Sequence, residues 1–141
     1  MANPAISLSV RHQIFKQAND CCEYCKNQRA YSTAPFSVEH ILPLSKQGSS
    51  GLENLALSCP ACNGHKYNKQ AALDPLTRKV VPLFHPRTQI WEEHFVWDEQ
   101  RTQVLGLTPI GRATVKCLKM NRVESVNLRM VLVAFDRHPP G

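Results

Sequence analysis

The spacing of apolar residues predicts a chain of short helices and strands. Near the N-terminus, apolar residues recur at the spacing of a helical face, which predicts a helix over residues 10–19 with Ser9 as its N-cap. The residues of this face are Val10, Ile14, Phe15 and Ala18. We interpret the face as ordinary core packing, because a single apolar stripe on a helix is typical of a surface helix that covers a core.

The next stretch predicts two strands, a loop and a helix. Residues 36–41 alternate between apolar and polar side chains, as a half-buried strand does. Residues 45–51 contain two glycines and three serines, which is typical of a loop. Residues 55–58 predict a short buried strand. Residues 63–72 predict a helix that ends before an Asp-Pro pair.

The second half of the chain predicts a connection, a hairpin and two helices. Prolines mark an extended connection without regular structure, at Pro75, Pro82 and Pro86. Residues 94–97 and 103–107 are typical of the two arms of a hairpin. Thr108 followed by Pro109 predicts the start of a helix, and an apolar face after Asn121 predicts a last one. That face consists of Val123, Val126, Met130 and Val133. Together these elements predict an α+β fold.

Composition and charge narrow the class of protein. The 141 residues are 43% hydrophobic and 20% charged, as in one globular domain with a small appendage. Lysines and arginines total 17 against 11 acidic residues, and the net charge of +6 favours a polyanionic partner. No apolar run is long enough to span a bilayer, and the N-terminus lacks the features of a secretory signal. We therefore expect a cytoplasmic protein with no membrane partner and reduced cysteines.

Four of the six cysteines form two Cys-x-x-Cys pairs, Cys22 with Cys25 and Cys59 with Cys62. A structural Zn²⁺ takes four ligands in a tetrahedron, and two such turns can supply four thiolates to one ion. In a reducing compartment this spacing indicates a metal more often than a disulfide. The cysteines therefore predict a structural zinc site, with redox activity or ordinary burial as the alternative interpretation.

Side chains of another kind lie between the cysteine pairs. Glu39 offers a hard oxygen ligand for an ion such as Mg²⁺, and His40 can accept a proton from water near neutral pH. Adjacent strand residues face opposite sides, so both can serve one site only where the strand bends or ends. Asn54 can hold the glycine-rich loop against the histidine, and the side-chain oxygen of Asn63 can be a second metal ligand. Taken singly, each residue has an ordinary interpretation, as a surface histidine, a turn residue or a helix N-terminal residue.

In their order along the chain, these motifs resemble those of the HNH endonuclease family, with its ββα-metal motif or His-Me finger. The motifs are Cys-x-x-Cys, Glu-His-Ile-x-Pro, Asn-Leu and Cys-x-x-Cys-Asn-x-x-Lys, within roughly residues 10–72. The resemblance implies a small ββα-metal core with a four-cysteine zinc knuckle in residues 1–74. It implies that residues 75–141 are a C-terminal extension, a hairpin and helices packed on that core.

The resemblance also implies roles for individual residues. His40 would be the general base, Asn54 the orienting asparagine, and Glu39 and Asn63 the ligands of a catalytic Mg²⁺ or Mn²⁺. The sequence departs from the family pattern twice, with glutamate where aspartate is common and asparagine where the family name has histidine. The implied activity is metal-dependent hydrolysis of DNA that leaves a 5′-phosphate and a 3′-hydroxyl.

DNA is therefore the expected partner. The basic side chains expected to contact it are Lys66, His65, Lys69 and Arg112. One alternative is a zinc-knuckle nucleic-acid-binding module with weak or no nuclease activity, and another is a structural zinc domain that docks a protein. All three hypotheses use the cysteines, and they differ in whether Glu39, His40 and Asn63 form one site.

Overall fold

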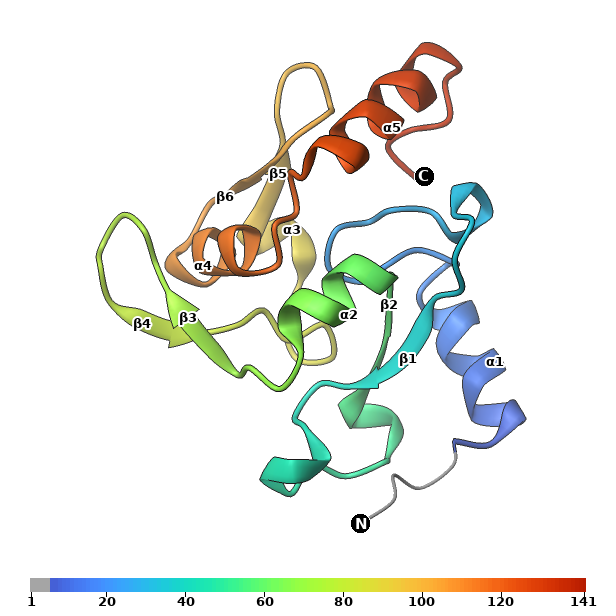
Figure 1. Ribbon diagram of the computed structural model, residues 1–141, viewed down its shortest axis with the longest axis vertical. Coiled ribbons are helices and arrows are strands. Elements are labelled where there is room, and N and C mark those ends of the chain that lie inside the picture. The colour runs from blue at the N-terminus through green and yellow to red at the C-terminus, as the bar shows by residue number, and fades with distance from the viewer. Residues whose placement is uncertain (1–5) are drawn as a thin grey trace.

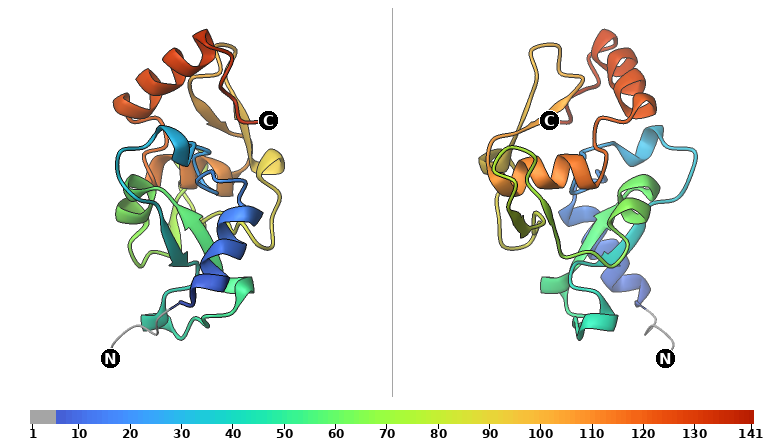
Figure 2. Two further views of the ribbon diagram at one scale, coloured as in Figure 1. Left: turned by 90° about the vertical axis from the view of Figure 1, so that its right-hand side faces the viewer. Right: turned by 60° about the vertical axis from the view of Figure 1, so that its left-hand side comes forward.

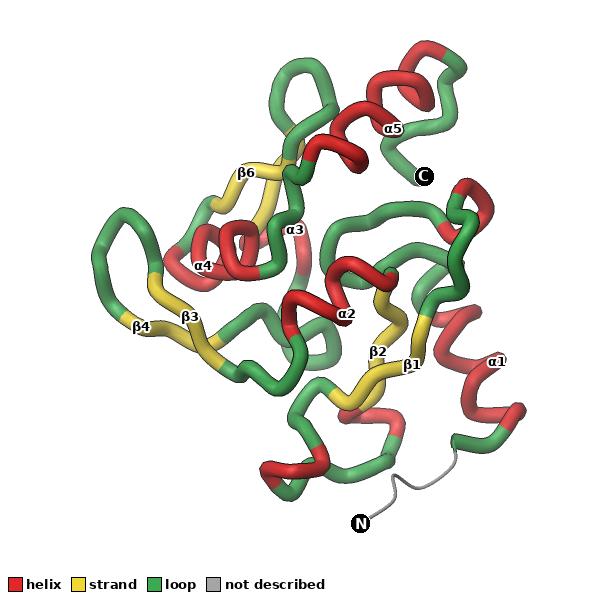
Figure 3. Tube along the Cα trace, viewed as in Figure 1, coloured by secondary structure: helices red, strands yellow, loops and turns green. Residues whose placement is uncertain are grey.

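The computed structural model describes residues 6–141. Within that range the protein is an α+β fold of five α-helices and six short strands, which pair into three two-stranded antiparallel sheets (Figures 1 and 3). In chain order the elements are α1 (Leu8–Gln17), β1 (Ser37–His40), β2 (Leu55–Ser58), α2 (Pro60–Lys66), β3 (Ala71–Leu73), β4 (Val80–Pro82), α3 (Trp91–His94), β5 (Phe95–Trp97), β6 (Val104–Gly106), α4 (Pro109–Cys117) and α5 (Val123–Ala134). The predicted fold class is confirmed.

The first helix begins two residues earlier than predicted. The hydroxyl of Ser7, which has extended backbone angles, accepts a hydrogen bond from the amide of Val10 at 3.2 Å. Ser7 is therefore the N-cap, and Ser9 lies inside the helix, where it cannot cap. The predicted apolar face is confirmed, since Ile14 and Ala18 are buried in the core and its other members pack against it.

The hairpin β1–β2 and the helix after it form a strand–strand–helix unit. The register pairs His40 with Leu55 and Ser37 with Ser58. All four residues of β2 are buried, as predicted. Helix α1 contacts β2 and helix α2 contacts β1, so the two helices lie on either side of the hairpin (Figure 2).

Helix α2 begins three residues before the predicted start at residue 63 and ends six residues before the predicted end at residue 72. Cys59 is its N-cap, with the sulfur accepting from the amide of Cys62, and Pro60 occupies the first turn. The helix stops at Lys66, because Tyr67 adopts φ 49° and ψ −114°. Asn63 therefore lies in the middle of the helix, whereas the sequence placed it at the start.

The predicted extended connection after α2 is wrong, because β3 and β4 form a hairpin there, with Ala72 opposite Val81. Asp74 organises its turn by accepting from the amides of Leu76 and Thr77. Two hydrogen bonds from the Arg112 guanidinium, of 2.9 and 3.0 Å, lower the pKa of this carboxyl. The Asp-Pro pair thus begins a turn and does not end a helix.

The C-terminal elements follow the prediction except on one face. The hairpin β5–β6 and the Thr108 cap of α4 are confirmed. The predicted apolar face of the last helix is not the buried side of α5, since Val123 and Met130 are exposed. Arg129 is buried instead, because its guanidinium donates to the carbonyls of Thr102 and Met120.

One hydrophobic cluster spans the predicted boundary between residues 1–74 and 75–141. It contains Ile14 and Tyr24 together with Phe84 and Phe95, and all four cysteines of the two pairs. The indole of Trp91 donates to the carbonyl of Tyr24 at 2.8 Å. The division into residues 1–74 and 75–141 stays a prediction. Residues 1–5 of the first part lie outside the described range. No helix within residues 6–141 has the length and apolar content to cross a membrane.

The loop between β1 and β2 is clamped by Asn54. Its side chain accepts from the amide of Leu42 at 2.8 Å and donates to the carbonyls of Leu42 and Ser49 at 3.0 and 2.7 Å. Gly48 lies against this clamp, and a Cβ there would be 1.8 Å from the Leu42 carbonyl oxygen and 2.8 Å from Nδ2 of Asn54. Only glycine fits this close approach.

We expect Gly48→Ala to lower the free energy of unfolding by roughly 1–3 kcal/mol, because the added methyl group must displace the clamp. Chemical denaturation measures the change. Gly64→Ala is the matched control, since a Cβ at Gly64 meets nothing within 4 Å. Alanine is the better residue inside a helix by about 1 kcal/mol, so this variant should be neutral or more stable. Equal unfolding midpoints for the two variants would contradict the close contact.

Candidate functional site

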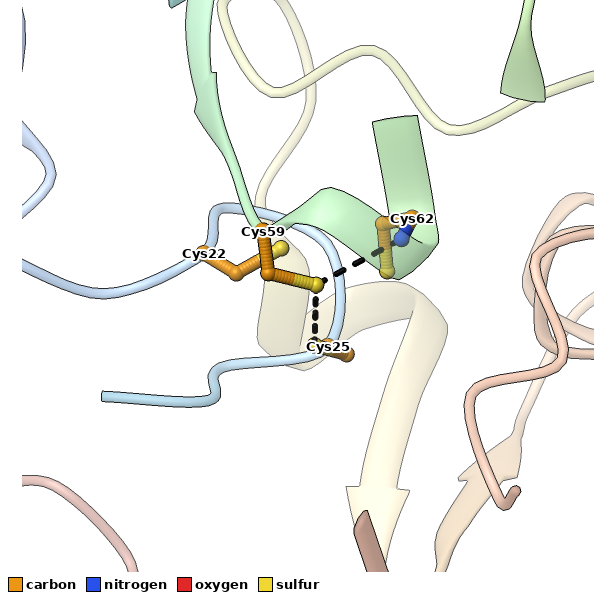
Figure 4. A group of neighbouring side chains, drawn as sticks. All are labelled: Cys22, Cys25, Cys59 and Cys62. Carbon is orange, nitrogen blue, oxygen red and sulfur yellow. Dashed lines mark hydrogen bonds between the residues drawn. The ribbon is translucent and has the colours of Figure 1, made fainter. Parts of the chain in front are cut away.

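Four cysteine sulfurs meet where the turn after α1 approaches the start of α2 (Figure 4). Cys22 and Cys25 come from the turn, and Cys59 and Cys62 from the helix N-terminus. All four are buried, and their sulfurs lie within 4.8 Å of one another. The spacing of the two pairs therefore predicted the cluster correctly.

The cluster fits zinc in both distance and chemistry. Four sulfurs at about 2.3 Å from one Zn²⁺ stand about 3.8 Å apart in a tetrahedron. The sulfurs of Cys25 and Cys59 are 3.7 Å apart. Burial raises the pKa of the Cys22 thiol, so thiolates need a cation in this enclosed space. These residues form a structural site of the zinc type.

Arg122, which sequence reasoning missed, caps the cluster from the C-terminal half of the chain. Its guanidinium donates to the sulfurs of Cys59 at 3.3 Å, Cys25 at 3.8 Å and Cys62 at 4.0 Å. Four thiolates around one Zn²⁺ leave two negative charges, which this cation offsets in part. Arg129 adds a second link, with a 3.5 Å hydrogen bond to the carbonyl of Cys25. No local pattern identifies Arg122 as a contact of the cluster, since the three cysteines to which it donates are at least 60 residues away.

A second group of candidate residues borders an open groove of about 580 Å³ between β1 and α2. Glu39 and His40 reach it from the end of β1, and Asn63 and Tyr67 from α2 and its last turn. The opposite wall is the 3-10 turn that begins at Leu44. The groove therefore brings an acid, an imidazole and an amide oxygen to one place.

The Glu39 carboxylate faces α2 and is buried. It accepts a 2.5 Å hydrogen bond from the Tyr24 hydroxyl, and its other oxygen lies 3.8 Å from the ammonium of Lys66. Burial raises the pKa of Glu39, although Lys66 and the hydrogen bond from Tyr24 act in the opposite direction. The residue thus combines a structural contact with a position at the groove.

His40 is the last residue of β1, and its ring is held from the loop side. Nε2 lies 3.0 Å from the hydroxyl of Ser50. Burial lowers the pKa of this imidazole below its ordinary value of 6.5, so the ring is neutral at pH 7. The strand ends here, and Ile41 donates from its amide to the carbonyl of Asn54 at 2.8 Å. Asn54 therefore fixes the chain immediately after the histidine.

One of the predicted DNA contacts, Lys66, is not free to meet a phosphate. Lys66 is buried, and its ammonium donates to the carbonyl of Ile41 at 2.8 Å. Arg112 is held in the ion pair with Asp74. His65 and Lys69 remain accessible on and beyond α2, where the Lys69 ammonium donates to the carbonyl of His65. Burial, and then the charges of Lys119, Arg122 and Lys69, lower the pKa of His65.

These observations define the class of the domain. It is a strand–strand–helix unit with a four-cysteine cluster at the start of its helix. Residues 22–69 match the family model described as HNH endonuclease. The match includes both cysteine pairs and the residues of the groove, and it confirms the resemblance. Searches of the curated proteins and of the solved structures give no match to the chain.

We expect Arg122→Met to weaken zinc binding by about 10- to 100-fold, the range found when a group that hydrogen-bonds a metal ligand is lost. The thiolates would keep their geometry but lose the cation that offsets their charge. Competition with a chromophoric chelator measures the affinity. Lys119→Met removes an exposed charge nearby and should leave it unchanged. Equal affinities for both variants would show that the contacts with sulfur do not stabilise the site.

Proposed function

We propose that the protein is a metal-dependent DNA endonuclease that hydrolyses phosphodiester bonds with His40 as the general base. An HNH domain indicates a nuclease-type function in general. The observation that carries the finer proposal is the single groove shared by Glu39, His40 and Asn63. A nuclease needs a base and oxygen ligands beside the same phosphate, and these side chains provide both.

His40 is suited to take a proton from water. Its lowered pKa keeps the imidazole neutral near pH 7, and Ser50 holds one of its ring nitrogens. In the proposed reaction, the oxygen of that water bonds to phosphorus while the bond from phosphorus to the 3′ oxygen breaks. His40 accepts a proton from the water, and the departing 3′ oxygen takes one from solvent. The products are a 5′-phosphate and a 3′-hydroxyl.

Glu39 and Asn63 offer the oxygen atoms that would hold Mg²⁺ or Mn²⁺. Each carboxylate oxygen of Glu39 has two acceptor positions, so the contacts with Tyr24 and Lys66 leave others open. When bound, such an ion stabilises the negative charge that develops on the phosphate and on the leaving oxygen. Asn54 would orient the base by fixing the segment that follows it.

One observation favours a second candidate, a zinc-knuckle nucleic-acid-binding module with weak or no nuclease activity. The carboxylate of Glu39 is only 6% exposed, between Tyr24 and Lys66, which is also what a purely structural residue would show. An experiment that measures both DNA binding and DNA cleavage separates the two functions. Binding of DNA without cleavage in any divalent metal would favour this module.

We expect His40→Ala to slow the cleavage of supercoiled DNA in Mg²⁺ or Mn²⁺ by about 100- to 10,000-fold, the usual contribution of a general base. Folding and zinc content should not change, since the ring contacts Ser50 and makes no hydrogen bond to a cysteine sulfur. His12→Ala removes an exposed histidine of α1 and serves as the control. Cleavage by His40→Ala at the wild-type rate would exclude His40 as the base.

The cleavage rate should also depend on pH in a defined direction. Acid protonates the imidazole and removes the base, so the rate should rise with pH and level off above the pKa of His40. That pKa lies below 6.5, so the midpoint should also lie below 6.5. The rate at saturating metal from about pH 5 to about pH 8 gives the midpoint. Because Glu39 also titrates in acid, an NMR titration of the His40 ring must give the same value. A midpoint above 7 would contradict the assignment.

A further inference from the structure

Tyr67 lies at the groove, with groups of the proposed reaction. It lines the same groove as His40 and Asn63. The residue is 75% exposed, which is the largest value for any large hydrophobic residue in the described part of the chain. An aromatic residue this exposed adds little to the core and is available to a ligand in the groove.

The backbone of Tyr67 forms the turn that ends α2. Its amide donates to the carbonyl of Asn63 at 2.9 Å and closes α2. Its φ of 49° and ψ of −114° belong to a region that glycine adopts freely and that other residues rarely adopt. Glycine would therefore make this turn with less strain. Such conformations in non-glycine residues cluster at functional sites, and here one places an aromatic residue at the groove.

Two exposed lysines lie close in sequence to residues of the groove. Lys46 ends the 3-10 turn Leu44–Lys46, whose first two residues line the groove, and Lys69 follows Tyr67 by two residues. Lys46 is close enough to α2 that its charge contributes to the lowered pKa of Lys66. Positive charge near the groove therefore accompanies the exposed aromatic residue.

We propose that Tyr67 stacks on an unpaired nucleobase next to the phosphate that is cut, so that the substrate has a single-stranded segment at the groove. This inference rests on the proposed function. In a duplex each base is already stacked and paired, so a protruding ring can stack only on a base that has left the helix. Positive charge along the backbone together with an aromatic platform for bases is the usual basis of single-strand binding.

The test uses the whole 141-residue chain loaded with zinc and a single-stranded oligonucleotide that carries one 2-aminopurine, a fluorescent base. The His40→Ala background prevents turnover during the titration. We expect binding to quench the 2-aminopurine. In the same background, Tyr67→Ala should bind about 5- to 100-fold more weakly and lose the quench, whereas Tyr67→Phe should keep both, because stacking needs the ring and not the hydroxyl.

Two further variants control for folding and for exposed aromatic area. Tyr67→Gly should raise the unfolding temperature, because glycine relieves the strained turn, and should bind as weakly as Tyr67→Ala. Phe135→Ala removes a ring that is 73% exposed after the end of α5, and it should bind like the parent protein. A Tyr67→Gly variant that is more stable yet binds poorly would separate the loss of binding from misfolding.

The outcomes distinguish this inference from the proposed function. Binding by Tyr67→Ala within twofold of the parent would overturn the stacking role, even if the wild-type protein cuts DNA. Equal sensitivity of a fully paired duplex to Tyr67→Ala would overturn the requirement for an unpaired base. A quench that depends on Tyr67 in a protein that cuts no DNA would support the stacking role and reject the endonuclease proposal alone.

Discussion

The four-cysteine cluster is the constraint on which the rest of the structure depends. The hairpin β1–β2 has four residue pairs and α2 has seven residues, and neither is stable alone at that length. The cluster ties the turn before the hairpin to the helix after it, with all four sulfurs inside the core. Structural Zn²⁺ contributes about 10–16 kcal/mol in small zinc-binding peptides, as much as the net stability of a whole domain.

The same constraint sets the geometry of the groove. Strand β2 leads directly into Cys59, and His40 is paired with the first residue of β2. Asn63 follows Cys62 and therefore takes its place from the zinc-type site. Arg122 and Arg129 extend the constraint to α5 through contacts with sulfur and with the carbonyl of Cys25. The imidazole and the amide oxygen face one groove because the chain between them is held at the cysteines.

The sequence predicted the parts of the site whose signal is local. The chemical groups of the two Cys-x-x-Cys turns lie within a few residues of one another, and so do those of the Glu-His pair at the strand end. Spacing alone was therefore enough to find them. The exposure of Lys66 was misjudged, and the ion pair of Arg112 was not foreseen, because both depend on distant partners. The carbonyl of Ile41 is 25 residues before Lys66, and Asp74 is 38 residues before Arg112. A sequence does not distinguish an exposed basic side chain from a buried one.

The limits of several elements were misjudged for the same reason. The hairpin β3–β4 was missed because its turn residues also occur where helices end. Only the pairing of the two strands distinguishes a hairpin turn from a helix end. One local signal was available and was not used. Cys59 followed by Pro60 is an N-cap with proline in the first turn, which would have placed the start of α2 correctly.

The buried pair of Glu39 and Lys66 links the stability of the domain to the proposed chemistry. The Lys66 nitrogen lies 3.8 Å from a Glu39 oxygen, the side chains of Glu39 and Lys66 are 6% and 2% exposed, and the pair joins β1 to α2. A divalent ion held by Glu39 would share that carboxylate with an ammonium of like charge. Burial lowers the pKa of Lys66, whereas the charge of Glu39 acts in the opposite direction. One carboxylate thus serves the contact between β1 and α2 and, in the proposed enzyme, the metal-binding side of the groove.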